Sequence, residues 1–210
     1  IDGSGIYDAN FTVNATGGNV TFTGAGTLKI GATVTSTSTS LGTLSTGAGT
    51  VWYDGGAITI VTDTYNNLRV SQANTKGTAG NINVNGTMTV DKYCIFDTET
   101  YTTTVTGASD INGTLKGSTG TYDANGSFDA TLGYVTFTGA GTLALGSTVT
   151  SLGTFTKSTS TVKYDGTSAQ TVNANTYYNL TIENASTKTA GGNLTVAGAL
   201  TTEAEASCKL

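Results

Sequence analysis

The side chains that could do chemistry in this 210-residue chain are chiefly carboxylates, because the sequence contains no histidine. Histidine is the usual general base near neutral pH and a frequent metal ligand, so its absence excludes Ser-His-Asp and Cys-His catalysis. Two acid pairs, Asp97/Glu99 and Glu203/Glu205, have a spacing of two residues, which would place each pair on one face of a strand. Paired carboxylates can cleave glycosidic bonds. We expect these pairs to be solvated charges instead, and we predict no enzymatic activity, no catalytic residue and no cofactor.

Four oxygen-bearing side chains at two turns are candidate calcium ligands: Asp8, Asn10, Asp123 and Asn125. Calcium prefers carboxylate and amide oxygens, but a calcium loop needs a denser set of acids than these turns contain. Aspartate and asparagine commonly cap turns through hydrogen bonds to the backbone, and that role accounts for all four residues. The sequence therefore predicts no metal site.

The composition excludes several partners. The formal net charge is −5 and the isoelectric point is near 4.4, whereas binding to nucleic acid requires a basic patch. No segment approaches the ~18 consecutive apolar residues of a membrane span. Nine Asn-x-Ser/Thr sequons are compatible with secretion. The sequence begins at Ile1 and shows no signal peptide, so we expect a mature product or a part of a longer protein, located outside the cell on its surface.

An internal repeat supplies the elements that would position these side chains. The nine-residue segment VTFTGAGTL occurs at 20–28 and again at 135–143, and the match around it extends in both directions. The chain is therefore nearly two copies of one unit of about 112 residues. We assign 1–115 to the first repeat unit and 116–210 to a second, incomplete unit that stacks continuously on the first.

Comparison of the two copies shows which positions the fold must hold constant. Leu68 and Val70 correspond to Leu180 and Ile182, whereas the residues between them change freely. A period of two is expected of a strand with one buried face. The residues of the first copy that are predicted to point inward are Val20, Phe22, Leu28, Ile30, Val34, Leu44, Val51, Tyr53, Leu68, Val70, Ile82, Val84, Met88 and Val90.

Short strands recur between glycine-containing turns, and no segment shows a helical period. Nested repeats of roughly 20 residues are typical of a solenoid, in which each coil stacks on the preceding one. We therefore predict an all-β fold, a right-handed parallel β-solenoid (β-helix). The alternative is two tandem antiparallel β-sandwiches, because Asp54-Gly55, Asn85-Gly86 and Asn112-Gly113 resemble two-residue hairpin turns. In the solenoid, Asn67 and Asn179 are expected in an amide ladder between coils, pointing inward or lying at a corner.

Four segments carry a resemblance to a known family: YNNLRV at 65–70, YYNLTI at 177–182, GNINVNGTMTV at 80–90 and GNLTVAGALT at 192–201. They resemble the repeats of large secreted, Thr/Gly/Asn-rich surface proteins and adhesins of bacteria and archaea. The resemblance covers nearly the whole chain. It implies a parallel β-helix in an extracellular stalk, filament or coat, and it specifies no activity and no catalytic residues.

We expect a structural protein that assembles head to tail, because the end coils of a solenoid present unpaired strand edges. Its main partner would be a further copy of itself, and glycans or a host or neighbouring surface are further candidates. The residues predicted to make contacts between subunits are Ile1, Ile6, Tyr7, Phe11, Cys94, Ala206, Cys208 and Leu210. The two cysteines are 114 residues apart, nearly one unit, so they are expected in corresponding places that are too distant for a disulfide within one chain. If oxidised they would join successive subunits, and free buried thiols are the alternative.

Two other functions are compatible with the sequence. Trp52 falls on the outward parity of its strand, where its counterpart is Lys163, and an exposed aromatic ring could serve a carbohydrate-binding or carbohydrate-cleaving β-helix. Several exposed aromatic side chains beside carboxylates would favour that function, whereas a single isolated tryptophan would not. Threonine-rich strands such as the one at 21–23 could order water on an ice-binding face, although strand propensity also explains them.

Overall fold

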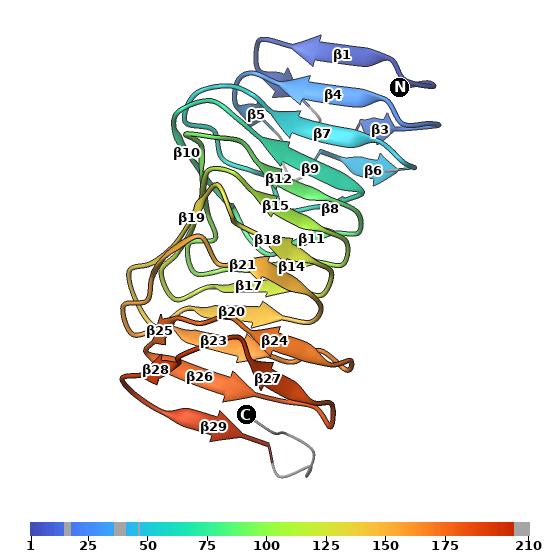
Figure 1. Cartoon of the computed structure of the whole chain (residues 1–210). Helices are drawn as coiled ribbons and strands as arrows, with labels where there is room; N and C mark the ends of the chain where they lie inside the picture. The colour runs from blue at the N-terminus through green and yellow to red at the C-terminus, as the bar shows by residue number, and fades with distance from the viewer. Residues whose placement is uncertain (15–17, 36–40, 46, 204–210) are drawn as a thin grey trace.

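The computed structural model describes residues 1–14, 18–35, 41–45 and 47–203. These residues form strands and turns without a helix, and every strand pairing between them is parallel. The chain winds in about 9 turns around one axis, with β1 (Ile6–Ala9) and β29 (Leu200–Thr202) at opposite ends of the stack (Figure 1). The predicted parallel β-solenoid is confirmed, and the alternative of antiparallel sandwiches is wrong.

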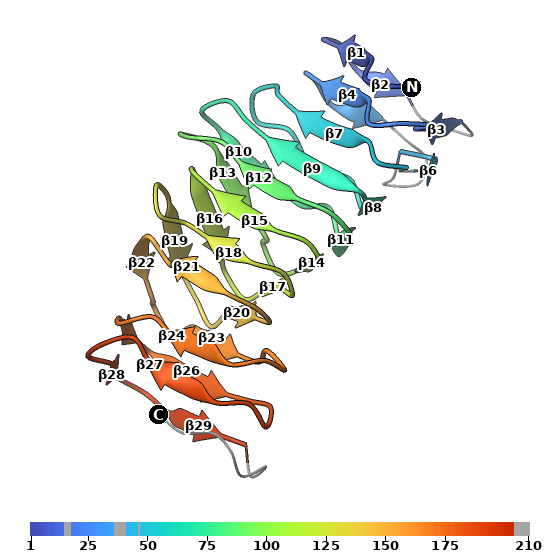
Figure 2. The ribbon, with the colours of Figure 1, turned by 45° about the vertical axis from the view of Figure 1, so that its right-hand side comes forward.

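Three faces run along the solenoid, and successive turns add extended segments to each of them (Figure 2). The first sheet contains β1, β4 (Thr27–Ile30), β7 (Thr50–Tyr53), β9 (Asn67–Val70), β12 (Met88–Val90), β15 (Ser109–Ile111), β18 (Phe128–Asp129) and β21 (Val149–Ser151), in that order. Its face continues with the pair β24 (Gln170–Val172) and β27 (Lys188–Ala190).

The second sheet is shorter and contains β10 (Thr75–Gly77), β13 (Ile95–Asp97), β16 (Thr114–Gly117), β19 (Tyr134–Phe137) and β22 (Thr154–Thr156). Chain order places on the same face the pairs β2 (Val13–Asn14) with β5 (Val34–Thr35) and β25 (Thr176–Tyr177) with β28 (Thr195–Val196).

The third sheet contains β8 (Thr64–Tyr65), β11 (Ile82–Val84), β14 (Thr102–Val105), β17 (Thr121–Ala124), β20 (Thr142–Leu145), β23 (Thr161–Tyr164), β26 (Asn179–Ile182) and β29. Chain order places the pair β3 (Asn19–Thr21) and β6 (Thr43–Ser45) before it.

Equivalent strands of the two sequence copies lie on different faces of the solenoid. Five steps along the first sheet lead from β1 to β15, and the chain then passes through β16 to β17 on the third sheet. Tyr7 of β1 and its sequence equivalent Tyr122 of β17 therefore lie on different sheets, and so do Leu68 and Leu180. One unit fills five turns and two of the three faces of a sixth, so the second copy is rotated by one third of a turn about the axis.

Alternate strand positions fill the interior with apolar side chains. In β4 and β9 the second and fourth residues are buried, whereas the first and third are partly exposed. The predicted inward set is confirmed where the structure describes it, although Val20 and Leu44 are only partly buried and the Val34 side chain lies outside the description. Leu200, the equivalent of Met88, is 52% exposed because no further described coil covers β29. Each fully buried aliphatic side chain contributes about 1.5–3 kcal/mol.

Glycines stack on one another at the corner between the third and first faces. A Cβ atom on Gly107 would lie 2.3 Å from the carbonyl oxygen of Gly86, and one on Gly126 would lie 2.0 Å from that of Gly107. Only glycine allows adjacent coils to approach so closely at this corner. The Asn-Gly and Asp-Gly pairs that resemble hairpin turns are therefore corners between parallel strands.

Two asparagines connect neighbouring coils at corners. Asn67 Oδ1 accepts a hydrogen bond of 2.9 Å from the backbone N–H of Thr87, and Asn179 Oδ1 accepts one of 3.0 Å from Ala199. The four residues are equivalent in the two copies. The predicted corner positions are thus confirmed, on two different faces, but the predicted amide ladder is wrong at these two residues, because their amides bond the backbone of neighbouring coils and not another amide.

Candidate binding surface on the first sheet

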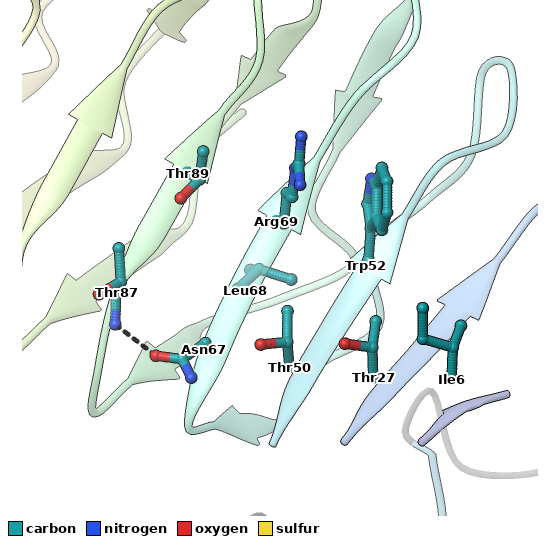
Figure 3. A pocket seen from close by; sticks show the side chains of 9 residues that line it. All are labelled: Ile6, Thr27, Thr50, Trp52, Asn67, Leu68, Arg69, Thr87 and Thr89. Carbon is teal, nitrogen blue, oxygen red and sulfur yellow. Dashed lines mark hydrogen bonds between the residues drawn. The ribbon is translucent and has the colours of Figure 1, made fainter. Parts of the chain in front are cut away.

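A shallow trough on the outer side of the first sheet gathers aromatic, cationic and hydroxyl side chains (Figure 3). It has a volume of about 340 Å³ and is lined by Ile6, Thr27, Thr50, Trp52, Asn67, Leu68, Arg69, Thr87 and Thr89. Alternate residues of a strand point to opposite sides of a sheet, so the outward positions of adjacent parallel strands form columns along the solenoid axis. The strands β1, β4, β7, β9 and β12 supply these columns.

Trp52 lies in one such column between Lys29 and Arg69, which are its register partners on β4 and β9. Lys29 Nζ is 4.9 Å and Arg69 Cζ is 4.1 Å from the centroid of the indole ring, distances at which a cation is attracted to the ring. The indole Nε1 donates a hydrogen bond of 2.8 Å to Ser71 Oγ. Trp52 is on the outer side of the sheet, as expected, but it is half-buried. Because its two cationic neighbours lie on opposite adjacent strands, the ring offers no free face to a sugar.

Carboxylates neutralise both cations of this column. Lys29 Nζ lies 2.8 Å from Asp54 Oδ2 and 2.8 Å from Asp8 Oδ2, and hydrogen bonds to Asp54 and Asp8 raise the pKa of Lys29. Arg69 Nη2 lies 2.8 Å from Asp91 Oδ2. The trough therefore holds no uncompensated cation for a phosphate. Partly exposed ion pairs of this kind contribute only about 0–1 kcal/mol each.

The acid pairs singled out in the sequence do not form two facing carboxylates. Asp97 is buried, and its Oδ2 lies 2.6 Å from Lys116 Nζ. Asp97 Oδ1 accepts a hydrogen bond of 2.9 Å from the backbone N–H of Glu99. Its carboxylate is thus part of a structural ion pair, and the expectation of a solvated charge is wrong for Asp97. Glu203 Oε2 accepts a hydrogen bond of 3.1 Å from the Asn184 backbone, and Glu205 lies outside the described residues.

The candidate calcium ligands lie at strand ends and corners. Asp8 is ion-paired with Lys29, and Asn125 Nδ2 donates a hydrogen bond of 3.3 Å to Asp123 Oδ2. Asn10 is exposed directly after β1. Among the residues that the structure describes, no group of three or more histidine, cysteine, aspartate or glutamate side chains could hold a metal ion.

The predicted contact residues near residue 1 cluster on the first coil. Ile6, Tyr7 and Phe11 are 67%, 62% and 84% exposed, and Ile1 packs partly buried against the core. Cys94 is fully buried, and burial raises the pKa of its thiol to about 11. A disulfide from Cys94 to a neighbouring chain would require its coil to open. Ala206, Cys208 and Leu210 lie outside the described residues.

Sequence reasoning missed two features. Tyr93, Leu132 and Tyr134 are exposed beside a hollow of about 280 Å³ on the second sheet. Tyr134 stands where the first copy has Asn19, and this departure from the repeat is the signal that could have found the hollow. The second feature is a pair of equivalent lysines that are fully buried inside the solenoid, at inward positions of β10 and β27. These are Lys76 and Lys188.

The described part of the chain contains no helix that is long and apolar enough to cross a membrane. Comparisons of the sequence with protein families and with curated proteins, and of the chain with solved structures, find no match.

Proposed function

We propose that this chain is a structural building block of an extracellular filament, sheath or adhesive surface stalk, and that it assembles head to tail without enzymatic activity. The observation that carries the proposal is the first coil. Among the described residues, the edge of β1 that faces away from β4 has no strand partner. Unpaired backbone donors and acceptors along such an edge favour addition of another strand.

Apolar side chains on the first coil support an interface at this edge. Ile6 and Phe11 are exposed, and their equivalents inside the stack are Thr121 and Gly126, so the fold itself does not require an apolar residue at either position. A hollow of about 250 Å³ opens into the core at the same end. It is lined by Ile1, Tyr7, Val13, Asn19, Val20, Thr21 and Leu28. A second copy that covered this end would remove these side chains from water.

The opposite end of the described chain also has an uncovered strand edge. Within the described residues, β29 pairs only with β26, and Leu200 of β29 is exposed. A contact between two unlike ends is heterologous and does not close on itself, so repeated addition produces a fibre. The location outside the cell is part of the proposal, and the sequons and the resemblance to surface repeats support it.

The experiment is electron microscopy and sedimentation velocity of the purified chain over a range of concentrations. We expect fibres of constant width whose length grows with concentration. A double variant, Ile6→Thr with Phe11→Gly, gives the first coil the residues that stand at the equivalent positions inside the stack, Thr121 and Gly126. The double variant should raise the concentration needed for assembly about tenfold or more. A few buried apolar side chains, here Ile6 and Phe11, carry most of the affinity of an interface.

The matched control is Leu132→Ser, which removes a similarly exposed apolar side chain far from β1 and should leave assembly unchanged. Circular dichroism of each variant checks that the solenoid is intact. A chain that stays monomeric at every concentration contradicts the proposal, and so does assembly that is insensitive to the double variant.

A further inference from the structure

We propose that the hollow between Tyr93 and Tyr134 on the second sheet binds an acidic polysaccharide through its uronic acid residues. The hollow has a volume of about 280 Å³ and is lined by Lys92, Tyr93, Ile95, Asn112, Gly113, Thr114, Leu132 and Tyr134. This site lies away from the first coil, and the inference does not depend on head-to-tail assembly.

Three successive coils build the hollow. Ile95 of β13, Thr114 of β16 and Tyr134 of β19 are register neighbours, so the middle coil lies between the two tyrosine-bearing coils. Adjacent strands are about 4.8 Å apart, which separates the two walls by roughly 10 Å. A Cβ atom on Gly113 would lie 2.3 Å from the Asp91 carbonyl oxygen, so no side chain can fill the floor there. The result is a gap between two rings over a small, polar floor.

The backbone of Tyr93 is strained in a way that presents its ring. Tyr93 has a φ of 68°, in the left-handed region that favours glycine and disfavours a bulky side chain. Its side chain is nevertheless 71% exposed, so packing does not compensate the strain. Four other described non-glycine residues have a positive φ, among them Gln72 at the same corner of the preceding coil, so the feature that points to a ligand is the exposed ring and not the strain.

The opposite wall of the hollow, formed by Leu132 and Tyr134, is also apolar, although the fold does not require apolar side chains there. Leu132 is 75% exposed, and Tyr134 is exposed at a position where the first copy has Asn19. Neither side chain therefore contributes to the core. Tyrosine offers a flat ring and a hydroxyl group, a combination that suits the apolar C–H face and the hydroxyl groups of a pyranose.

The polar groups of the hollow favour a sugar that carries a carboxylate. In the described part of the chain Lys92 has no ion pair, and its Nζ lies 4.9 Å from the centroid of the Tyr93 ring. Lys92 is also exposed, so its ammonium group is accessible to an anionic ligand. Asn112 Nδ2 donates to Asp110 Oδ1 at 2.8 Å, and the floor also presents the Asn112 amide oxygen and the Thr114 hydroxyl group to hydroxyls of a ligand. Lys92 would pair with the uronate carboxylate.

The dimensions favour a saccharide over a protein partner. A stable protein interface buries on the order of 1,200 Å² or more, whereas the exposed apolar side chains here surround one small hollow. Its volume is close to the lower end of the range for small-ligand pockets, about 300 Å³. A polysaccharide could place one or two sugar residues there and continue along the threonine-rich surface on either side.

The test is isothermal titration of the whole chain with two probes, a hyaluronan hexasaccharide and chitohexaose. Both contain N-acetylglucosamine, but only hyaluronan carries glucuronate. We expect hyaluronan to bind more tightly. Tyr93→Gly should weaken that binding about tenfold or more, because it removes one of the two ring platforms. Glycine accepts the local backbone conformation, so this variant should fold at least as well as the parent chain.

Two further variants separate charge from shape. Tyr134→Asn introduces the residue of the first copy and should also weaken binding, whereas Lys92→Gln should abolish the preference for hyaluronan over chitohexaose. Trp52→Phe, on another face, should bind as the parent does. The proposal is overturned if neither probe binds, if Lys92→Gln keeps the preference, or if Tyr93→Gly abolishes self-association instead, which would assign the hollow to a second copy.

Discussion

Lys76 and Lys188 occupy the same position of the two sequence copies and are both fully buried, yet their ammonium groups have different surroundings. Lys188 Nζ donates a hydrogen bond of 2.7 Å to the Gly166 carbonyl oxygen and another to Ser186 Oγ. Lys76 Nζ has no hydrogen-bond partner within the described residues. Burial lowers the pKa of Lys76, and the nearby Cys94 and Asp54 oppose that shift.

Replacement of the two lysines by methionine should therefore have opposite effects. Lys76→Met removes a buried and unpaired polar group, and we expect the free energy of unfolding to rise by about 1–3 kcal/mol. Lys188→Met removes the hydrogen bonds from the ammonium group to the Gly166 carbonyl oxygen and to Ser186 Oγ, and only the Ser186 hydroxyl group still donates to that carbonyl. It should lower the free energy of unfolding by about 1–3 kcal/mol. Urea unfolding at neutral pH measures both changes. Equal effects of the two substitutions would contradict this interpretation.

Lys76 also makes the stability of the chain depend on pH, with a sign that can be predicted. The pKa of Lys76 is lower in the folded chain than the value of 10.5 for an unperturbed lysine. Between these two values the unfolded state binds more protons, so the contribution of Lys76 to stability rises with pH. The advantage of Lys76→Met over the parent chain should therefore shrink as the pH approaches 10.5. Urea unfolding midpoints of the parent chain and of Lys76→Met, measured at pH values up to 10.5, provide the test.

The stacked glycines Gly86, Gly107 and Gly126 predict a large loss of stability when one of them gains a side chain. Gly107→Ala would place a Cβ atom 2.3 Å from the Gly86 carbonyl oxygen, so the two coils would have to move apart. We expect a loss of more than about 2 kcal/mol in thermal or urea unfolding. Gly56→Ala is the control, because the nearest atom to its new Cβ would be 3.9 Å away. That variant should change stability by less than about 1 kcal/mol.

The period of two in the sequence predicted the strands and the inward residues, and the nested repeats of roughly 20 residues predicted the parallel stack. It did not reveal how the copies are oriented. Tyr7 and Tyr122 align in sequence but lie on different sheets, because the number of strand segments in one unit is not a multiple of the three faces. Alignment of the two copies gives the number of residues in one unit, but it does not give the number of strand segments in one turn of the solenoid. Asn85-Gly86 misled for another reason. Neither residue has the positive φ that a two-residue Asn-Gly hairpin turn requires, and glycine is needed there because a Cβ atom on Gly86 would lie 2.4 Å from Asn67 Oδ1 on the neighbouring coil.

Surface features were harder to predict than the core. Trp52 was identified by its outward parity, but its two cationic neighbours are 17 and 23 residues away in sequence, and only the register of β4, β7 and β9 brings them together. Tyr93 and Tyr134 belong to different turns and share no sequence motif. Their proximity follows from the number of residues per turn, which a pattern of alternating apolar residues does not fix.

Buried tyrosine pairs predict instability in alkali. The hydroxyl oxygens of Tyr53 and Tyr65 lie 3.1 Å apart, and those of Tyr164 and Tyr177 lie 3.4 Å apart at the equivalent place in the second copy. Burial raises the pKa of all four hydroxyl groups above 10.0. Their contribution to stability is present below pH 10.0, where unfolded tyrosine begins to ionise, and is lost as the pH rises further.

Denaturant midpoints measured from about pH 8 to about pH 11 should therefore decline at the alkaline end. The four tyrosines outnumber Lys76, whose contribution has the opposite sign. Tyrosinate absorbance should show these rings ionising only as the chain unfolds. Ionisation of all tyrosines near the unperturbed value while the chain remained folded would show that the pairs are solvated.

The environment of Trp52 can be tested with the residue that the second copy uses in its place. Lys163 Nζ lies 2.6 Å from Glu183 Oε2 and 3.7 Å from Asp165 Oδ2, so a cation is stabilised there. Trp52 has Lys29 and Arg69 beside it instead. Trp52→Lys would place three cations in one column, and we expect a loss of about 1–2 kcal/mol that becomes smaller at high salt, because ions screen the repulsion.

Trp52→Phe is the matched variant, because it keeps an aromatic ring between the two cations and loses the hydrogen bond from Nε1 to Ser71 together with the area of the second ring. Its loss should be about 1 kcal/mol and nearly independent of salt. Urea unfolding at low and high ionic strength distinguishes the two variants. If both losses responded equally to salt, the cations would not be held against the ring, and Trp52 would contribute to the first sheet through its apolar area alone.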